Sequence, residues 1–510
     1  MLLADLVAAS AAVGSTRSRT AKVAALAAAL GTADPDEVET ATSYLSGVLR
    51  QRRTGLGWRG LSRLPEPAPQ SSLTVAQVHE AFEEMSRLSG PGSSSRRSAI
   101  SDALFGSATA EEQQYLRRLA AGELRQGALD GLMLEAVAVA AGVPAAEVRR
   151  AAMFAGSTLP VAVAALAGGT DALAGFGLRP GRPVRPMLAS SAADVSEALA
   201  KVADPGEPVA VDTKLDGIRV QVHKHDGRVQ VFTRSLEEIT DRVPEVVDAV
   251  AVLSAGTLVL DGEAIALGVD GRPRPFQETG ARTASRVDVA ALRAQVPLTA
   301  YFFDLLHVDG EDVVDLPGSQ RFARLTEVLP PDLVVPRTVT ADPETARQVF
   351  AEVVASGHEG VVVKGLDAPY DAGRRGAAWV KVKPRHTLDL VVLAVEWGSG
   401  RRRGWLSNIH LGARDPGGGF VMLGKTFKGM TDEMLAWQTE RFLALATERT
   451  PYGVTLRPEQ VVEVAFDGIQ TSTRYPGGMA LRFARVLRYR DDTTAAEADT
   501  VDTVRTLRAP

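Results

Sequence analysis

Residues 209–234 read VAVDTKLDGIRVQVHKHDGRVQVFTR, and their pattern predicts β-structure for the middle of the chain. Apolar and polar residues alternate on both sides of Asp226-Gly227. That alternation is the period of a β-strand, and Asp-Gly is favoured in a type I′ hairpin turn. The stretch therefore predicts one strand that ends near Lys214 and a β-hairpin that follows it.

Lys214 lies on the polar face of the first predicted strand. Side chains alternate along a strand, so Val209 and Val211 face a core, whereas Asp212, Lys214 and Asp216 lie on the other face. A lysine beside two carboxylates is ordinarily a charged, salt-bridged amine, and it becomes a nucleophile only when desolvation or nearby cations remove its proton. The tetrapeptide K-L-D-G alone also fits an exposed strand lysine before a turn.

Composition restricts the class of protein. The chain has 510 residues, enough for three or so domains, and its apolar fraction of 45% is ordinary for a globular protein. It has no cysteine, which excludes disulfides, a thiol nucleophile and cysteine-bound zinc, and which fits a reducing cytoplasm. Asp5 interrupts the apolar N-terminus, so we expect no signal peptide, and no stretch is apolar enough to span a membrane.

The net charge of −5 weighs mildly against a nucleic-acid partner. The stretch from Arg374 to Arg403, however, carries eight basic residues against Asp389 and Glu396. Such a basic stripe can follow a phosphate backbone, although a solvated run of charges is an equal alternative.

The pattern of the chain changes at two places. Residues 1–177 show alanine and leucine at helical spacing, and Thr74 and Thr109 begin capping-box motifs. A glycine- and proline-rich break at residues 175–186 precedes strands with a period of two, and a second break follows Pro384. Beyond it, short strands with glycine-rich turns suit a small β-barrel. The predicted domains are residues 1–177, 184–386 and 387–510.

Five further segments carry candidate site residues, each with a plain structural alternative. Arg234 ends the return strand of the hairpin, Glu263 lies in a possible hairpin turn, Phe303 could be a core aromatic, and Glu359 to Lys364 could be a buried strand with charged ends. In WVKVK, alternation places Trp379, Lys381 and Lys383 on one face. Two lysines and a tryptophan on one strand face suit an anionic ligand.

Together with Lys214-Leu215-Asp216-Gly217, these segments follow one another in an order that resembles the nucleotidyltransferase motifs of ATP-dependent DNA ligases. RNA ligases and mRNA capping enzymes share the outline and remain the alternative. Three segments favour DNA ligases: residues 477–492 resemble their C-terminal signature, residues 424–433 resemble another barrel segment, and residues 111–142 resemble their helical DNA-binding domain.

The resemblance implies a fold and a set of site residues. The expected fold is multidomain, with an all-α N-terminal domain, an α+β nucleotidyltransferase (adenylation) domain and a C-terminal oligonucleotide-binding (OB) β-barrel. Lys214 matches the lysine that carries AMP, and Glu263 and Glu359 match carboxylates tied to metal binding. The positions that match ATP-binding residues are Asp212, Arg219, Arg234, Glu263, Phe303, Arg375, Lys381 and Lys383, and Arg482 and Arg485 match the C-terminal signature.

Three residues depart from the family pattern. Asp212 stands where a glutamate usually contacts the adenine amino group, Ala484 replaces a common proline, and Thr493 replaces a common lysine. The implied activity is the sealing of nicks in duplex DNA with ATP and Mg²⁺, through a lysyl-AMP intermediate and an adenylated 5′-phosphate. We expect a monomer in the cytoplasm, on the nucleoid if the source is bacterial, and no sequence segment identifies a protein partner.

Two other motifs are set aside. Residues 419–426 satisfy the P-loop pattern G-x-x-x-x-G-K-T, but their apolar centre is strand-like and no helix is expected to follow. His223 and His225 are explained as polar positions of the hairpin rather than as metal ligands. The absence of cysteine disfavours an NAD-dependent ligase, and the intact Lys214 disfavours a non-catalytic DNA-binding protein.

Overall fold

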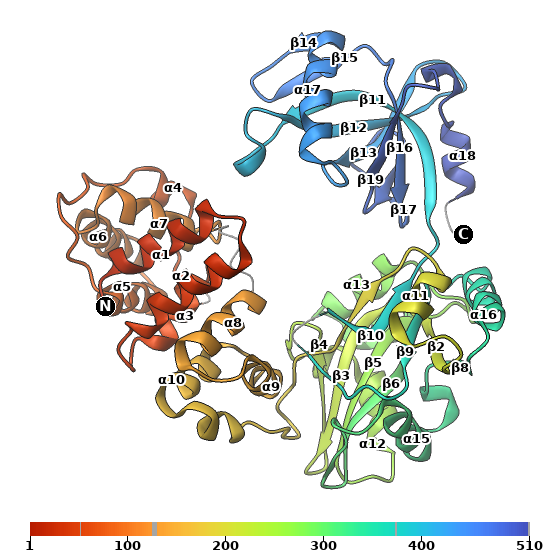
Figure 1. The fold of residues 1–510 in the computed structure, drawn as a ribbon, viewed down its shortest axis with the longest axis horizontal. Coiled ribbons are helices and arrows are strands. Elements are labelled where there is room, and N and C mark those ends of the chain that lie inside the picture. Colours follow the sequence, from red (N-terminus) through yellow and green to blue (C-terminus); the bar gives the residue numbers. More distant parts are fainter. Residues whose placement is uncertain (52, 125–129, 373–374, 508–510) are drawn as a thin grey trace. The chain divides into compact units, whose positions relative to one another are not determined.

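The computed structural model describes the chain except residues 52, 125–129, 373–374 and 508–510 (Figure 1). It contains two compact units. The first comprises residues 1–192, 196–346 and 362–380, and the second comprises residues 193–195, 347–361 and 381–510. Each unit is described by itself.

The first unit begins with a helical region that buries a continuous apolar core. Its helices are shown in red to gold in Figure 1. Thr74 and Thr109 cap their helices as predicted, because each side chain accepts from the N3 backbone N–H while Gln77 or Glu112 reaches back. The helices are α1 (Leu3–Ser15), α2 (Arg19–Gly31), α3 (Val38–Leu45), α4 (Trp58–Ser62), α5 (Val75–Arg87), α6 (Ser93–Gly106), α7 (Ala110–Ala120), α8 (Asp130–Ala141), α9 (Ala145–Ala155) and α10 (Leu159–Ala174).

Two five-stranded sheets follow. One has the order β1-β10-β9-β2-β8, and its strands are β1 (Leu188–Ser191), β2 (Val209–Lys214), β8 (Arg337–Thr340), β9 (Gly360–Gly365) and β10 (Arg375–Val382). The other has the order β4-β3-β5-β6-β7, and its strands are β3 (Ile218–His225), β4 (Arg228–Thr233), β5 (Leu258–Ala266), β6 (Leu298–Val308) and β7 (Glu311–Asp312). Helices α11 (Val195–Val202), α12 (Pro244–Ala251), α13 (Phe276–Ala284), α14 (Val289–Gln295), α15 (Gly318–Val328) and α16 (Pro343–Ala355) accompany the sheets.

The hairpin that opens the second sheet is the one predicted from the sequence. His225 pairs with Arg228, so the turn between β3 and β4 has two residues. Asp226 has φ 49° and Gly227 has φ 70°. Positive φ at both positions is the mark of a type I′ turn, which confirms the prediction.

A buried histidine fastens the segment between α10 and β1 to strand β3. His223 is 0% exposed, and its Nδ1 accepts from the Gly181 N–H at 2.9 Å while its Nε2 lies 2.8 Å from the Gln221 Oε1. The Gln221 amide also bonds both the N–H and the carbonyl oxygen of Val184. Because Nδ1 accepts, Nε2 must donate, so the ring is neutral. The hairpin position of His223 therefore serves packing, and the sequence did not reveal its burial.

Burial lowers the pKa of His223 to about 3. The unfolded chain binds a proton here below about pH 6.5, whereas the folded chain does not until about pH 3, so this stability is present above pH 6.5 and is lost as the pH falls. We expect His223 to make the loss of folding stability between pH 8 and pH 5 larger by about 2 kcal/mol. Denaturant unfolding of the protein and of His223→Gln at pH 8 and pH 5 measures it. Equal pH dependence in the two proteins would contradict this assignment.

The C-terminal part of the second unit is rich in strands. A seven-stranded sheet has the path β13-β12-β11-β15-β14, with β16 pairing β11 and β19, and β17 pairs β18 separately. The elements of this part of the chain are β11 (His386–Trp397), β12 (Leu406–Arg414), β13 (Phe420–Thr426), α17 (Asp432–Leu445), β14 (Ala446–Arg449), β15 (Gly453–Leu456), β16 (Val461–Phe466), β17 (Gly468–Thr471), β18 (Met479–Arg482), β19 (Arg485–Arg490) and α18 (Val501–Thr506).

The predicted fold class is confirmed. An all-α region precedes an α+β region, and the strand order of the C-terminal part is compatible with an OB-fold. The P-loop pattern falls on strand β13 and is not followed directly by a helix, so setting it aside was correct. No helix of the described residues is long and apolar enough to cross a membrane.

Candidate active site

Lys214 is the last residue of β2, and the turn after it packs closely on strand β5. Gly217 approaches so near that a Cβ there would lie 2.3 Å from the carbonyl oxygen of Ala264 and 3.0 Å from the Cγ of Glu263. Any larger residue would push the turn away. The glycine of the K-L-D-G motif therefore holds the turn after Lys214 against the strand that carries Glu263.

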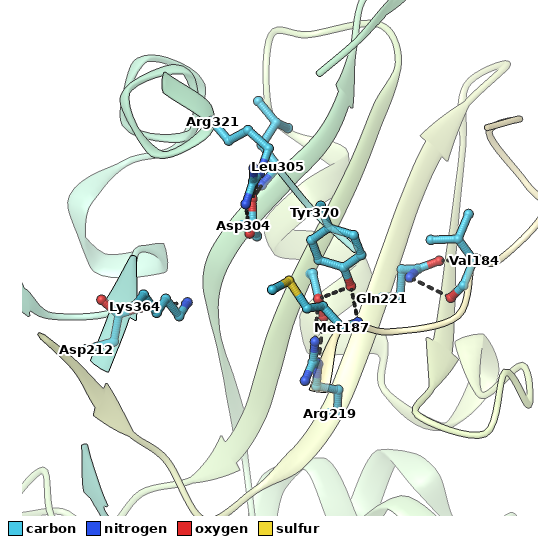
Figure 2. A network of polar contacts seen from close by, with 11 residues as sticks. Val184, Met187, Asp212, Arg219, Gln221, Asp304, Leu305, Arg321, Lys364 and Tyr370 are labelled. Carbon is cyan, nitrogen blue, oxygen red and sulfur yellow. Dashed lines mark hydrogen bonds and ion pairs between the residues drawn. The ribbon is translucent and has the colours of Figure 1, made fainter. Parts of the chain in front are cut away.

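Asp212 lies two residues before Lys214 and is only 2% exposed. Its carboxylate accepts two hydrogen bonds from the Arg337 guanidinium, and the Lys364 Nζ lies 2.7 Å from its Oδ2. Strands β8 and β9 flank β2 and supply these two cations. Burial alone would raise the pKa of Asp212, but Lys364 and Arg337 outweigh burial and hold that pKa below its ordinary value. The polar face of β2 is thus a buried ion cluster (Figure 2).

The facing sheet carries a second buried ion pair. The Arg219 guanidinium donates to both oxygens of Asp261, at 2.8 and 2.6 Å. The hydroxyl of Tyr370 donates to the same carboxylate at 2.6 Å and accepts from the Met187 N–H at 3.0 Å. Figure 2 shows the hydroxyl end of Tyr370 directed toward Met187 and Arg219. Because Asp261 fixes it from strand β5, the Arg219 guanidinium has one orientation.

Phe303 and Trp379 connect the two clusters. Their rings meet edge to face with centroids 5.8 Å apart. The Lys364 Nζ lies 4.6 Å from the Phe303 centroid and 4.2 Å from that of Trp379, and the Arg219 Cζ lies 4.9 Å from Phe303. Phe303 is partly buried. The two sheets therefore present an aromatic ring bordered by cations, which suits a planar base that carries phosphates.

In the second unit, Lys383 pairs with Glu359 and, at 3.2 Å, with Asp467. Burial alone would lower the pKa of Lys383, but the two carboxylates outweigh burial and raise it. Two predicted site residues, Lys383 and Glu359, thus form an ion pair with each other. Asp467 from the C-terminal part is a second partner of Lys383.

The remaining predicted residues lie at different places. Arg234 is exposed just after β4, and Lys381 is partly buried on β10. Arg375 begins β10, but its side chain lies outside the described residues, as does Arg374 of the basic stripe. Arg482 ends β18 and lies beside the Phe483 ring, and Arg485 begins β19 opposite Ala465.

The residues present fit a magnesium ion that is shared with a phosphate ligand. Mg²⁺ keeps several waters and binds through one or two carboxylates together with substrate phosphates. Glu263 offers such a carboxylate beside the turn of Lys214. Among the described residues, no three or more metal-ligating side chains cluster closely enough to hold a metal ion.

Sequence reasoning missed Arg337, Asp261 and Tyr370 and gave Lys364 no role. Lys364 follows three valines in a predicted strand, but only strand order reveals that β9 lies next to β2. Nothing in the sequence near Arg337 signals its partner, which is 125 residues away.

Comparison with known proteins identifies the family. The family description "ATP dependent DNA ligase domain" matches residues 186–383, "ATP dependent DNA ligase C terminal region" matches residues 402–493, and "DNA ligase N terminus" matches residues 59–138. A protein of Beutenbergia cavernae named "Probable DNA ligase" is 65% identical over 99% of both chains. A protein of the same name from Nocardioides is 64% identical over 99% of both chains.

The fold is also found among solved structures. The protein titled "Pmar-Lig_Pre." aligns with a TM-score of 0.63 and 18% identity over 96% of this chain and 99% of that chain. The one titled "Pmar-Lig_PreS3" aligns with a TM-score of 0.61 and 16% identity over 95% of this chain. With relatives this similar over the full length, and with the three family descriptions matched in order, the chain belongs to the ATP-dependent DNA ligase family.

Proposed function

We propose that this DNA ligase seals nicks with Lys214 as the residue that carries AMP. The Lys214 Nζ attacks the α-phosphorus of ATP, an N–P bond forms, the bond to the β-phosphate oxygen breaks, and pyrophosphate leaves while the amine releases its proton. AMP then passes to the 5′-phosphate at the nick. The 3′-hydroxyl finally displaces AMP and closes the backbone.

One observation carries the assignment of Lys214. Its turn is held against the strand of Glu263 by the close approach of Gly217, and it follows directly on the ion cluster of Asp212. A lysine whose turn packs on the strand that carries a carboxylate suited to magnesium supports a role for this lysine in attack on a phosphate. Labelling with α-labelled ATP in the presence of nicked DNA tests it. Label should appear first on protein and then on DNA, and label on neither would refute the proposal.

We assign the other predicted site residues the roles that the family resemblance implies. Phe303 supports the base, Arg219 and Arg234 serve the ribose and phosphates, and Lys381 faces the phosphates together with Arg375. Asp212 borders the base from within its ion cluster. A buried carboxylate that two cations keep ionised is an acceptor only, which suits the exocyclic amine of adenine.

Magnesium, when bound, neutralises the phosphates and the charge that develops on the leaving group. Glu263 and Glu359 are the carboxylates proposed to hold it. Glu359 pairs with Lys383 in this structure, so Glu359 would have to leave this ion pair to hold the metal, and Lys383 would keep its contact with Asp467.

The proposal extends to organisation and partners. We assign DNA binding to residues 1–177, adenylation to residues 184–386 and an OB-fold to residues 387–510. The protein acts as a monomer on nicked duplex DNA in the cytoplasm, which agrees with the absence of cysteine. Backbone and shape rather than base sequence guide binding, because a nick occurs in any sequence.

A fragment that starts at Pro183 should still form the AMP adduct. It keeps every proposed nucleotide residue, and it keeps Val184, whose backbone Gln221 fastens to β3. It should seal nicks poorly because the helical region is gone. Single-turnover adduct formation and nick sealing are measured side by side, with adduct formation as the control for folding. Sealing at the full-length rate, at equal enzyme and salt concentrations, would contradict this division.

A further inference from the structure

Tyr370 connects the segment between β9 and β10 to strand β5 through the carboxylate of Asp261. Its hydroxyl donates to the Asp261 Oδ2 at 2.6 Å, and the Arg219 Nη2 donates to the same oxygen at 2.6 Å. Asp261 and Tyr370 are both buried (Figure 2). One carboxylate oxygen is thus shared by a cation and by a hydroxyl from two different elements.

The direction of the hydrogen bond from Tyr370 is fixed by its second partner. The backbone N–H of Met187 lies 3.0 Å from the hydroxyl oxygen, and an N–H can only donate. The hydroxyl proton is therefore left for Asp261. Burial and the charge of Asp261 raise the pKa of Tyr370 well above its ordinary value, so the group remains a neutral donor.

Tyr370 is itself held in place at its backbone, its ring and its hydroxyl. Its backbone N–H donates to the Val314 carbonyl oxygen at 2.8 Å. Its ring meets the Trp379 ring edge to face with centroids 6.0 Å apart, and the Arg321 Cζ lies 5.9 Å from the centre of the same ring. The hydroxyl is therefore a fixed reference point for the carboxylate.

The carboxylate of Asp261 needs such a reference point, because the terminal torsion of an aspartate side chain is broad. Arg219 binds the carboxylate through both Nε and Nη2. A guanidinium is planar, so rotation of the carboxylate would turn the whole plane with it. A second donor on Oδ2 opposes that rotation.

The nitrogen of Arg219 that remains is the one available to a ligand. Nε and Nη2 are used by Asp261, whereas Nη1 has no hydrogen-bond partner in the described part of the chain. Nη1 carries two N–H donors. The Arg219 Cζ lies 4.9 Å from the centre of the Phe303 ring, which is proposed to support the base. The orientation of the carboxylate therefore decides where these two donors point beside the nucleotide.

We propose that Tyr370 is a positioning residue for ATP: its hydroxyl holds the Asp261 carboxylate, and the carboxylate directs Nη1 of Arg219 toward the nucleotide. This inference rests on the proposed function, since it places ATP at this site. Tyr370 acts through Arg219 and needs no contact with ATP. Loss of one hydrogen bond to a charged group corresponds to about 3- to 30-fold in affinity.

Tyr370→Phe tests the role of the hydroxyl, because it removes the O–H and keeps the ring. Single-turnover adduct formation over a range of ATP concentrations gives the dissociation constant of ATP and the rate constant at saturation. We expect the dissociation constant to rise by about 3- to 30-fold and the rate constant to change much less, since Arg219 is assigned to binding. An unchanged dissociation constant would overturn the inference.

A cycle with Arg219→Lys separates positioning from packing. Lysine keeps a cation for Asp261, but an ammonium is a point charge without a plane that the carboxylate could direct. The probe is α,β-methylene-ATP, which binds but cannot transfer AMP, so slow variants can also be measured. In the Arg219→Lys protein, Tyr370→Phe should change its dissociation constant by less than about twofold. The same loss with Arg219 and with Lys at this position would overturn the inference, because a hydroxyl that serves packing alone acts in both.

Tyr115→Phe is the matched control for the loss of a buried hydroxyl. Tyr115 is buried in the helical region, and its hydroxyl donates to the Tyr44 carbonyl oxygen at 3.0 Å. Denaturant unfolding should show a loss of stability in both variants, whereas only Tyr370→Phe should bind ATP more weakly. Equal weakening of ATP binding in Tyr115→Phe would assign the effect to stability and overturn the role of Tyr370.

Failure of the inference and failure of the proposed function give different results. If the unmodified protein forms no adduct with ATP, the proposed function fails. If it forms the adduct and Tyr370→Phe binds ATP equally well, only the role of Tyr370 fails.

Discussion

Lys214→Ala is expected to form no detectable adduct with AMP, and to keep its affinity for nicked DNA. The reaction needs an amine at the end of β2, and alanine removes it. The lysine on the neighbouring strand, Lys364, cannot substitute, because its amine is buried and paired with Asp212. Gel analysis with α-labelled ATP measures the adduct, and a binding assay with nicked duplex measures DNA affinity.

Lys224→Ala is the matched control for Lys214→Ala. Lys224 lies on β3, in the sheet that also carries Arg219. Its amine caps α12 by donating to the carbonyl oxygens of Ala251 and Leu253. This variant should form the adduct at the unmodified rate. An adduct in Lys214→Ala at a comparable rate would remove Lys214 from its role.

Arg485→Ala is expected to slow adduct formation by about 30- to 1000-fold, since one oriented cation in a phosphoryl-transfer site is worth about 2–4 kcal/mol. Arg485 is partly buried at the start of β19, and no carboxylate of the described residues pairs with it. Arg488 and Arg490 on the same strand are engaged by Glu463 and by Asp389. Arg485 is therefore the arginine of this strand that is left for a phosphate ligand.

The effect of Arg485→Ala should be confined to the step that uses ATP. On this hypothesis the guanidinium serves the β- and γ-phosphates, which are absent once AMP is on the DNA. Joining of a nick that already carries AMP should change far less than adduct formation. Arg457→Ala, at an exposed residue paired with Glu459, is the control. Equal losses in both steps would assign Arg485 to DNA binding or to the fold.

Much of the fold could be predicted from local signals. The hairpin is specified by alternation around Asp226-Gly227, and the helices at Thr74 and Thr109 are specified by their capping boxes. These signals act over a few residues, so they can be recognised in the sequence. The predicted strand GVVVKG has the same limits as β9, because a run of valines between two glycines is also a local signal.

The site was predicted less completely because its partners are distant in the sequence. Arg337 and Lys364 meet Asp212 only because β8, β2 and β9 are neighbours, and strand order depends on the whole domain. The ion pair of Lys383 with Glu359 is another such contact. The family resemblance supplied candidate site residues, but it did not show which of them contact each other.

The approach of Gly217 to Ala264 has a consequence for saturation mutagenesis. Every substitution at Gly217 places a Cβ 2.3 Å from a carbonyl oxygen, so all of them should fail to the same degree, whatever their polarity. Substitutions at Lys214 should fail as completely in an activity screen, yet yield well-folded protein. A screen of activity alone would score the two positions alike, and a parallel screen of protein abundance would separate the position proposed to perform chemistry from the one that provides space for it.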